Sequence, residues 1–262
     1  WAYKNAAAVV ALSPGMKEGV VATGYPAEKV AVIPNSSDNR EFAYDADAAR
    51  VFRTEREWLG DKPLLVYTGA FGKVNGVGYM VELASALLAR GSEVRILLVG
   101  AGAERDSVIQ AARRADVYLR NLFIEEPLPK KDIPGLLSAA TVASALFIDL
   151  PEMRLNSANK FFDALASGTP VLLNYGGWMH DLVTSRECGL PLWQKSAAEV
   201  AEVLDTKMYD QVWLDKAGRA ARTLAEEYFD RDVLAEQLIA VLQSAVDGEP
   251  HHAEEIAPGN YD

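Results

Sequence analysis

Residues 63–100 read PLLVYTGAFGKVNGVGYMVELASALLARGSEVRILLVG. The apolar runs at residues 63–69 and 93–100 are typical of buried strands, and the amphipathic segment at residues 77–90 is typical of a helix. A strand, a helix and a second strand of this kind imply two parallel strands joined by a right-handed crossover. This stretch therefore predicts an α/β fold.

The same alternation continues towards the carboxyl terminus. Further strands are expected at residues 121–126, 141–147 and 170–175, and further helices near residues 103–115, 132–139, 159–167 and 178–184. Beyond residue 193 the pattern is helical to about residue 246. We predict a doubly wound parallel sheet with helices on both faces, which binds ligands beyond the carboxyl ends of its strands.

A separate segment precedes this repeating order. Residues 6–13 form an apolar run that predicts a buried strand, and Pro14 suits the first turn of a helix. Residues 28–38 predict a short strand that ends in Pro-Asn-Ser-Ser-Asp, a sequence typical of turns and linkers. Residues 43–58 are charged and predict a helix that leads into the main domain.

The composition narrows the function classes. Half of the 262 residues are apolar, which suits one large α/β domain with additions. The net charge is −11, and five acidic residues after position 246, with no Lys or Arg there, leave about −6 for the rest. Nucleic-acid binding needs clustered positive charge, so this balance argues against it. We expect residues 248–262 to be an acidic, disordered tail.

The sequence also bears on the cellular compartment of the protein and on whether the chain is a fragment. The single cysteine, Cys188, allows no internal disulfide, which favours a reducing and therefore cytoplasmic compartment. The sequence contains no run of about 18 uncharged apolar residues, the length that a membrane-spanning helix needs. Because the chain opens on Trp1 rather than Met, we expect it to be a fragment of a longer protein.

A glycine-rich connection at residues 67–80 is the first candidate site. Its glycines allow a ligand to approach the backbone, the amides at the helix start favour a phosphate, and Lys73 supplies a positive charge. The connection is not a P-loop, because Val74 follows the Gly-Lys pair. The alternative is a glycine-rich turn with an incidental lysine. The glycines are Gly69, Gly72, Gly76 and Gly78.

Two weaker motifs are interpreted as structural. Gly100 and Gly102 give half of a dinucleotide-binding fingerprint, but Arg105 stands in the third glycine's place, so we interpret them as part of a strand-to-helix turn. The Asp-Ala-Asp triplet at residues 45–47 lies in a charged helical segment and is expected to be solvated surface. No His, Cys or carboxylate cluster has metal-ligand spacing, and no metal is expected.

Residues 155–174, LNSANKFFDALASGTPVLLN, form the second candidate site. A short helix is expected from about Ala158 to Ser167, with Gly168 just past its carboxyl end. Ser157 or Asn156 is expected to cap its amino end.

Three polar side chains of this helix share one side. Asp163 stands four residues after Asn159 and three after Lys160. They can form a structural Lys160–Asp163 pair, or they can form a site in which Lys160 and free amides bind phosphate and Asp163 accepts hydrogen bonds from sugar hydroxyls. Spacing alone leaves both interpretations open.

Four stretches resemble, in order and near spacing, the family 4 retaining glycosyltransferases of the two-Rossmann-domain type, called GT-B. They are VVALSPGMKEGVVATGYPAEKVAVIPNSSD, YTGAFGKVNG, LLVGAG and NKFFDALASGTPVLL. The entry SANKFFD is similar to that of members that act in surface-polysaccharide biosynthesis. The resemblance implies a Rossmann-like α/β domain that binds a nucleotide-sugar and needs no metal or other cofactor.

The resemblance also implies a domain organisation. Residues 1–35 correspond to the end of an acceptor-binding domain and the crossing between domains. Residues 36–228 correspond to the nucleotide-sugar-binding domain, and residues 229–247 to a terminal helix that packs back toward the first domain.

Site residues follow from the resemblance position by position. Asp163 falls where the family binds the ribose hydroxyls, and Lys73 and Lys160 are the implied catalytic cations that stabilise the leaving diphosphate. The other implied donor-binding residues are Gly69, Gly72, Asn75, Ile124, Leu128, Ser157 and Asn159.

Two departures from the family pattern bear on activity, and in a third Asn75 stands where the glycine-rich loop has a lysine. Leu155 stands where the family has its first motif glutamate, and Ala70 stands where the glycine-rich loop has an arginine. These departures favour an alternative in which the chain is a catalytically inactive nucleotide-binding module for assembly or regulation. A sugar-nucleotide epimerase on the same scaffold is a second alternative.

The main expectation is a retaining hexosyl- or N-acetylhexosaminyltransferase that uses a UDP-linked donor and acts in cell-surface polysaccharide biosynthesis. Its acceptor is a saccharide or lipid-linked molecule bound by the absent amino-terminal domain. Membrane association, peripheral and at the inner face, is expected only through that absent part.

Overall fold

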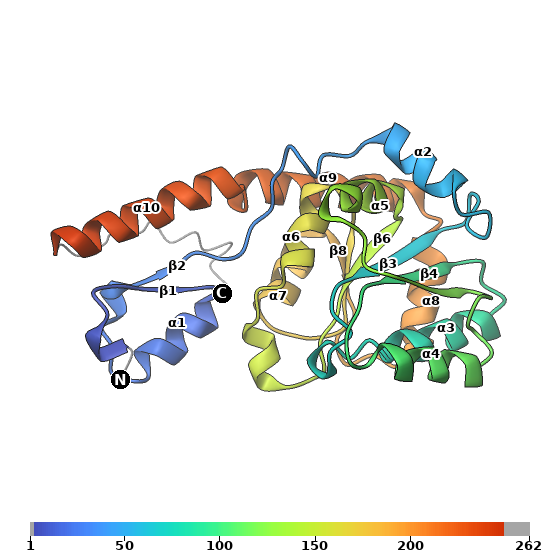
Figure 1. Ribbon diagram of the computed structural model, residues 1–262, viewed down its shortest axis with the longest axis horizontal. Helices are drawn as coiled ribbons and strands as arrows, with labels where there is room; N and C mark the ends of the chain where they lie inside the picture. Colours follow the sequence, from blue (N-terminus) through green and yellow to red (C-terminus); the bar gives the residue numbers. More distant parts are fainter. Residues whose placement is uncertain (1–2, 249–262) are drawn as a thin grey trace.

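The computed structural model of the protein describes residues 3–248 (Figure 1). Its main body is a six-stranded sheet in which all strands are parallel. The strands are β3 (Leu64–Thr68), β4 (Arg95–Val99), β5 (Leu122–Glu125), β6 (Val142–Ala145), β7 (Val171–Leu173) and β8 (Gly189–Pro191). Their spatial order is β5-β4-β3-β6-β7-β8, so the winding reverses between β3 and β6. That reversal is the topological switch point beyond which such sheets bind ligands.

Helices cover both faces of this sheet, as predicted (Figure 1). The helices of one face are α2 (Ala46–Thr54), α5 (Ile133–Ala139), α6 (Asn159–Ala166), α7 (Trp178–Arg186) and α9 (Gln211–Tyr228). Those of the other face are α3 (Tyr79–Ala89), α4 (Arg105–Arg114) and α8 (Ala197–Lys207). Short 3-10 helices lie at η1 (Tyr3–Asn5), η2 (Ala27–Lys29), η3 (Lys73–Asn75), η4 (Lys130–Asp132) and η5 (Pro151–Leu155).

The alternation of strand residues explains this double covering. Side chains of successive strand residues point to opposite faces, and β3 is apolar at every position from Leu64 to Tyr67. Val66 is buried in the core that includes α5, α6 and α9, whereas Leu65 is buried in the core that includes α3, α4 and α8. The continuous apolar run in the sequence is therefore the signature of a strand with two buried faces.

A small unit precedes the main body. It contains the parallel strands β1 (Val9–Ala11) and β2 (Val30–Val32), joined by α1 (Pro14–Val21). As predicted, Pro14 begins the helix, and the Ser13 hydroxyl accepts a hydrogen bond from the Met16 amide at 3.1 Å.

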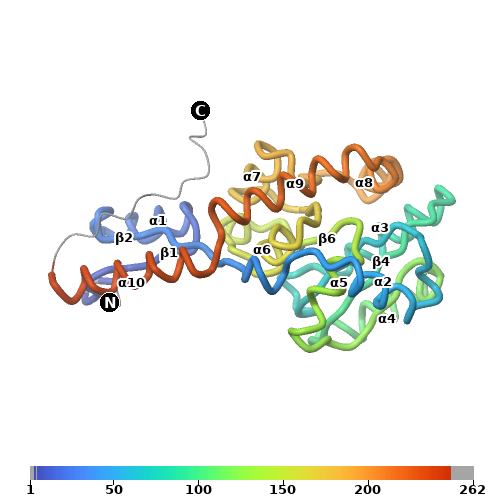
Figure 2. The backbone as a smooth tube through the Cα atoms, turned by 90° about the horizontal axis from the view of Figure 1, so that it is seen from above, coloured from blue at the N-terminus to red at the C-terminus, as the bar shows by residue number. Residues whose placement is uncertain are grey.

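The last helix, α10 (Arg231–Asp247), leaves the main body and lies along this small unit (Figures 1 and 2). Its Leu234 and Val241 are buried together with Ala31 and Ile33 of the β2 segment. Two stretches of chain therefore cross between the small unit and the main body: one after β2 and one between α9 and α10.

The two crossings are joined by backbone hydrogen bonds. The Ser37 amide donates to the Phe229 carbonyl at 3.4 Å, and the Arg231 amide donates to the Ser37 carbonyl at 3.1 Å. These bonds form an isolated parallel bridge between Ser37 and Asp230. The crossings therefore lie side by side.

Two further expectations bear on the ends and the environment of the chain. Beyond Gly248, the expected acidic tail lies outside the described residues. Within residues 3–248, no helix combines the length and the apolar character needed to span a membrane.

Candidate functional site

A cavity of about 580 Å³ opens at the carboxyl ends of β3, β4 and β5, beside the start of α6. We call it the switch-point pocket. Its lining residues are Thr68, Gly69, Ala70, Val99, Gly100, Ala101, Pro127, Leu128, Ile133, Asn159, Lys160 and Asp163. Two strand-to-helix loops form one wall, apolar residues after β5 form the second, and the polar side of α6 forms the third. The pocket therefore combines apolar surface with a few convergent polar groups, as ligand sites do.

Glycines make the first wall possible. Gly100 has φ 155°, and a Cβ atom there would overlap the Gly69 carbonyl. The two loops lie this close because the Gly69 amide donates to the Val99 carbonyl at 2.9 Å and the Phe71 amide donates to the Ala101 carbonyl at 2.8 Å. The glycine of the half fingerprint thus serves close loop packing, in agreement with its interpretation as part of a turn.

Lys160 of the third wall extends toward Gly69 of the first wall. A Cβ atom added to Gly69 would lie 2.9 Å from Lys160 Cε, so Gly69 leaves space for this side chain. Lys160 Nζ lies 5.1 Å from the centroid of the Tyr67 ring, within cation–π range. Burial lowers the pKa of Lys160, and the nearby Asp163 carboxylate partly offsets this effect. A half-buried ammonium of this kind is suited to bind an anion that enters the pocket.

Asp163 lies one turn further along α6 and is also half-buried. Its Oδ1 accepts a hydrogen bond from the Ser37 hydroxyl at 2.7 Å. Burial raises the pKa of Asp163 to about 6, although the Ser37 hydrogen bond and the charge of Lys130 act in the opposite direction. Among residues 3–248, Asp163 and Lys160 do not approach within the 4 Å of a direct ion pair, although each charge affects the pKa of the other group.

The amino end of α6 differs from the prediction. Ala158 is the N-cap residue and has no side chain able to cap, so the expectation of a Ser157 or Asn156 cap was wrong. The Ser157 hydroxyl instead accepts a hydrogen bond from the Asn35 amide at 3.2 Å, and Asn156 Oδ1 accepts one from the Ser157 amide at 2.6 Å. The first amides of α6 thus have no side-chain cap, which leaves a helix end able to bind an anion.

The pocket brings together half of the candidate residues from the sequence. Those that line it are Gly69, Leu128, Asn159, Lys160 and Asp163. Those that do not line it are Lys73, Gly72, Asn75, Ile124 and Ser157. Ile124 is buried within β5, and Lys73 is exposed on η3. Asn75 and Gly72 close the turn that carries Lys73, since the Asn75 amide donates to the Gly72 carbonyl at 3.0 Å.

Sequence reasoning did not identify Ser37 and Lys130 near the pocket. Both line a neighbouring cavity of about 480 Å³, which we call the crossing pocket. This cavity lies between the first crossing and the start of α10, and Asn159 and Asp163 line it as well. Asp163 therefore lies on the wall between the two pockets. The only sequence signal for Ser37 was its place in a polar linker.

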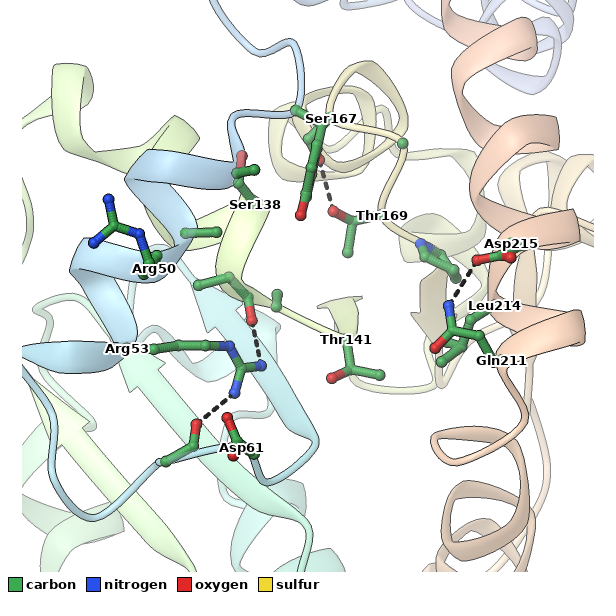
Figure 3. A pocket seen from close by; sticks show the side chains of 18 of the residues that line it. Arg50, Arg53, Asp61, Ser138, Thr141, Ser167, Thr169, Gln211, Leu214 and Asp215 are labelled. Carbon is green, nitrogen blue, oxygen red and sulfur yellow. Dashed lines mark hydrogen bonds between the residues drawn. The ribbon is translucent and has the colours of Figure 1, made fainter.

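A third cavity, of about 600 Å³, lies at the opposite, amino-terminal ends of the strands (Figure 3). Its polar groups bind one another. Arg53 donates to the carbonyls of Gly60 at 2.9 Å and Ala139 at 2.6 Å, and Gln211 donates to Asp215 at 2.7 Å. Because these groups already have partners, we interpret this cavity as a structural cleft.

The Asp-Ala-Asp triplet has a structural role. Asp45 caps α2 by accepting hydrogen bonds from the amides of Asp47 and Ala48, each at 2.9 Å, and Asp47 pairs with Arg50. Among residues 3–248, no group of three His, Cys, Asp or Glu side chains is placed to hold a metal ion.

Leu155 lies outside the switch-point pocket, at the boundary with the small unit. Its carbonyl accepts a hydrogen bond from the Ser13 hydroxyl at 2.7 Å, and its side chain lies against Gly15. The position of the expected glutamate is thus used for a contact between the small unit and the main body.

Comparison with known proteins connects this geometry to a family. The model for glycosyl transferases group 1 matches residues 62–208. The chain is 30% identical over 244 residues to an alpha-D-kanosaminyltransferase of Streptomyces kanamyceticus, covering 92% of this chain and 61% of that protein. It is 20% identical over 246 residues to an uncharacterized glycosyltransferase of Methanocaldococcus jannaschii, covering 91% of this chain and 60% of that protein. The chain thus spans about three fifths of the length of these relatives.

Solved structures share the fold. HepE of Anabaena in complex with UDP and glucose superposes with a TM-score of 0.78 at 20% identity, covering 93% of this chain and 65% of that chain. Sucrose-phosphate synthase from Thermosynechococcus elongatus superposes with a TM-score of 0.76 at 21% identity, covering 92% of this chain and 59% of that chain. Both superpositions extend over almost the whole of this chain.

Proposed function

The chain belongs to the group 1 glycosyl transferases, and from this membership we propose that it is the donor-binding part of an enzyme that takes a sugar from a UDP-linked donor. The observation that carries the proposal is the third wall of the switch-point pocket. There the uncapped start of α6, the Lys160 ammonium and the Asp163 carboxylate face one cavity. These are the groups that a diphosphate and a ribose need, in the order in which a nucleotide presents them.

The proposed chemistry is electrostatic. When the bond between sugar and diphosphate breaks, negative charge develops on the departing oxygen, and preorganised donors at that place lower the barrier. Lys160 and the amides of α6 are the proposed donors in the pocket, with Lys73 of the exposed glycine-rich loop as a second cation. No metal and no covalent nucleophile are required in this scheme.

The UDP donor has independent support. HepE of Anabaena, which also superposes in its complex with UDP-glucose at a TM-score of 0.76, binds that nucleotide-sugar. The apolar wall of Pro127, Leu128 and Ile133 provides a surface on which a base can lie. We propose that the base occupies this wall, while Asp163 accepts hydrogen bonds from the ribose hydroxyls.

The finer parts of the proposal rest on the resemblance of the SANKFFD entry to surface-polysaccharide members. They are transfer with retention, a hexosyl or N-acetylhexosaminyl group, and a saccharide or lipid-linked acceptor. On this proposal the enzyme acts in the cytoplasm, at the inner face of the membrane, and the acceptor is bound by the remaining part of the protein.

Titration calorimetry with UDP, UDP-sugars and GDP tests the donor site. Asp163→Ala is expected to weaken UDP binding by about 1 to 3 kcal/mol, because ribose hydroxyls lose their acceptor. The matched control is Asp47→Ala on the exposed first turn of α2, where binding should stay unchanged. A folded chain that binds none of these nucleotides would remove the proposal.

The position of Leu155 favours one alternative, a nucleotide-binding module without transfer activity. In this alternative the residue serves only the contact with Ser13 and Gly15. The full-length protein, given a UDP-sugar and a pool of lipid-linked acceptors, separates the two functions. Nucleotide binding without any transferred sugar would support the alternative.

A further inference from the structure

Ser37, in the first crossing, contacts the candidate ribose-binding residue from outside the pocket. We propose that Ser37 is a positioning residue for Asp163: its hydroxyl holds Oδ1, so that the carboxylate presents its other oxygen to the donor. This inference rests on the proposed function, because it assumes that Asp163 binds the ribose of a nucleotide-sugar.

The backbone of Ser37 is held on both sides. Its amide donates to the Phe229 carbonyl and its carbonyl accepts from the Arg231 amide, so Ser37 is bonded to the second crossing. The residue is only 4% exposed. Its hydroxyl therefore has a defined position, 2.7 Å from Asp163 Oδ1.

A second contact fixes the same segment against α6. The Asn35 amide donates to the Ser157 hydroxyl at 3.2 Å, and Asn35 Nδ2 donates to the Ser157 carbonyl at 2.5 Å. Residues 35–37 are thus attached just before the start of α6 and again at Asp163, one turn into the helix. A shift of the crossing would move the hydroxyl relative to the carboxylate.

The hydrogen bond from the Ser37 hydroxyl also affects the pKa of Asp163. Burial raises the pKa of Asp163, the repulsion from Glu41 adds to this, and the Ser37 hydrogen bond, Lys130 and Lys160 lower it. Lys130 is already paired with Glu41 at 3.0 Å, which weakens its net effect on Asp163. Ser37 is therefore the neutral donor that keeps the carboxylate ionised and able to accept hydrogen bonds from hydroxyl groups.

The effect should be visible in the pH dependence of donor binding. The ionised carboxylate accepts hydrogen bonds, whereas its protonated form has one oxygen that is a donor. Affinity for UDP-glucose should therefore fall as the pH is lowered through the pKa of Asp163. UDP-glucose is the suitable probe, because its diphosphate carries no proton that titrates in this range.

The test is calorimetric titration of the 262-residue chain with UDP-glucose from about pH 5 to about pH 8. Ser37→Ala should weaken binding about tenfold at neutral pH and move the fall in affinity to higher pH by about one unit. Ser37→Thr, which keeps the hydroxyl, should restore the profile. The neighbouring Ser36→Ala is the matched control and should bind as the unaltered chain does.

Two further measurements separate positioning from a general loss of structure. In Asp163→Asn the pH dependence should disappear. In Asp163→Ala, which removes the acceptor of the Ser37 hydroxyl, adding Ser37→Ala should have little further effect, because coupled residues are not additive. Carbon NMR of the Asp163 carboxyl without nucleotide should show a higher pKa in Ser37→Ala. This readout needs no ligand and shows whether the hydroxyl acts on the carboxylate, while the double variant shows whether that contact matters for donor binding.

The outcomes distinguish the inference from the proposed function. If Ser37→Ala keeps both the affinity and the pH profile of the unaltered chain, the inference is wrong and the donor site stands. An equal loss of affinity at every pH, with the Asp163 pKa unchanged, also overturns it. If the unaltered, folded chain does not bind UDP-glucose, the proposed function and the inference both fail.

Discussion

Asp163 provides a carboxylate in the wall of the switch-point pocket, and its burial lowers the stability of the folded chain. Its pKa of about 6 lies above the ordinary value of 3.8, so the folded chain holds this proton more tightly than the unfolded chain does. As the pH rises from about 4 to about 6, the unfolded state releases the proton first and stability falls. Above pH 6, the full penalty of a half-buried carboxylate is present.

Asp163→Asn should therefore stabilise the chain at neutral pH. Asparagine keeps an oxygen that can accept the Ser37 hydroxyl but carries no charge to desolvate. We expect a gain of about 1 to 2 kcal/mol at pH 7.5, reduced for the partial exposure of the side chain, measured by urea unfolding. The gain should shrink as the pH is lowered through 6 towards 4. A variant that is less stable than the parent at pH 7.5 contradicts this assignment.

At the scale of elements, the close packing of the two strand-to-helix loops can be tested at Gly100. Gly100→Ala should destabilise the chain by about 2 to 4 kcal/mol, because the new Cβ atom would overlap the Gly69 carbonyl. Gly91→Ala is the matched control: its φ of 72° is also positive, but no atom lies within 4 Å of the added Cβ.

Thermal unfolding of both variants isolates the steric clash from the strain of a positive φ. Gly91→Ala should show only the smaller cost of the backbone conformation. Equal losses in the two variants would mean that the loops can separate without cost, and that their close packing does not shape the first wall of the switch-point pocket.

Elements with a strong local pattern could be predicted from the sequence. The helix α6 follows from Phe161, Phe162 and Leu165 at helical spacing, and the αL residue Gly168, with φ 68°, ends it as predicted. The strand β8, Gly189–Pro191, could not be predicted, because it contains a glycine and a proline, which are depleted in strands. The strands β1, β2 and β7 are equally short but lie within apolar runs that predict them, so the local pattern is informative where the residue types favour the element.

The candidate site was harder to predict, because its details depend on distant residues. Ser157 has the chemistry of a helix cap, but Asn35, 122 positions earlier in the chain, occupies its hydroxyl. Ser37 reaches Asp163 across 126 positions. Spacing along one helix correctly placed Asn159, Lys160 and Asp163 on one side, whereas these long-range contacts leave no local trace.

At the scale of the whole molecule, α10 connects the small unit to the main body. Leu234→Ala should destabilise the chain by about 2 to 4 kcal/mol, because Leu234 is 3% exposed and its loss leaves a cavity against Ile33. Leu238→Ala, on the same helix but 40% exposed, is the control and should change little.

Amide hydrogen exchange should show which elements lose stability in Leu234→Ala. We expect faster exchange of the amides in β1, β2 and α10, with the amides of β3 to β8 unchanged, because local unfolding follows the contacts that are lost. Faster exchange throughout the six-stranded sheet would show instead that the small unit and the main body unfold together.

The bridge between Ser37 and Asp230 restricts the movements available to the molecule. When a single segment of chain connects two bodies, they can both twist and bend about it. Two connections bonded side by side resist twisting and leave bending across their common line as the soft motion. Any opening and closing of the small unit over the main body should then follow nearly one path, so little orientational entropy is lost when the two faces meet.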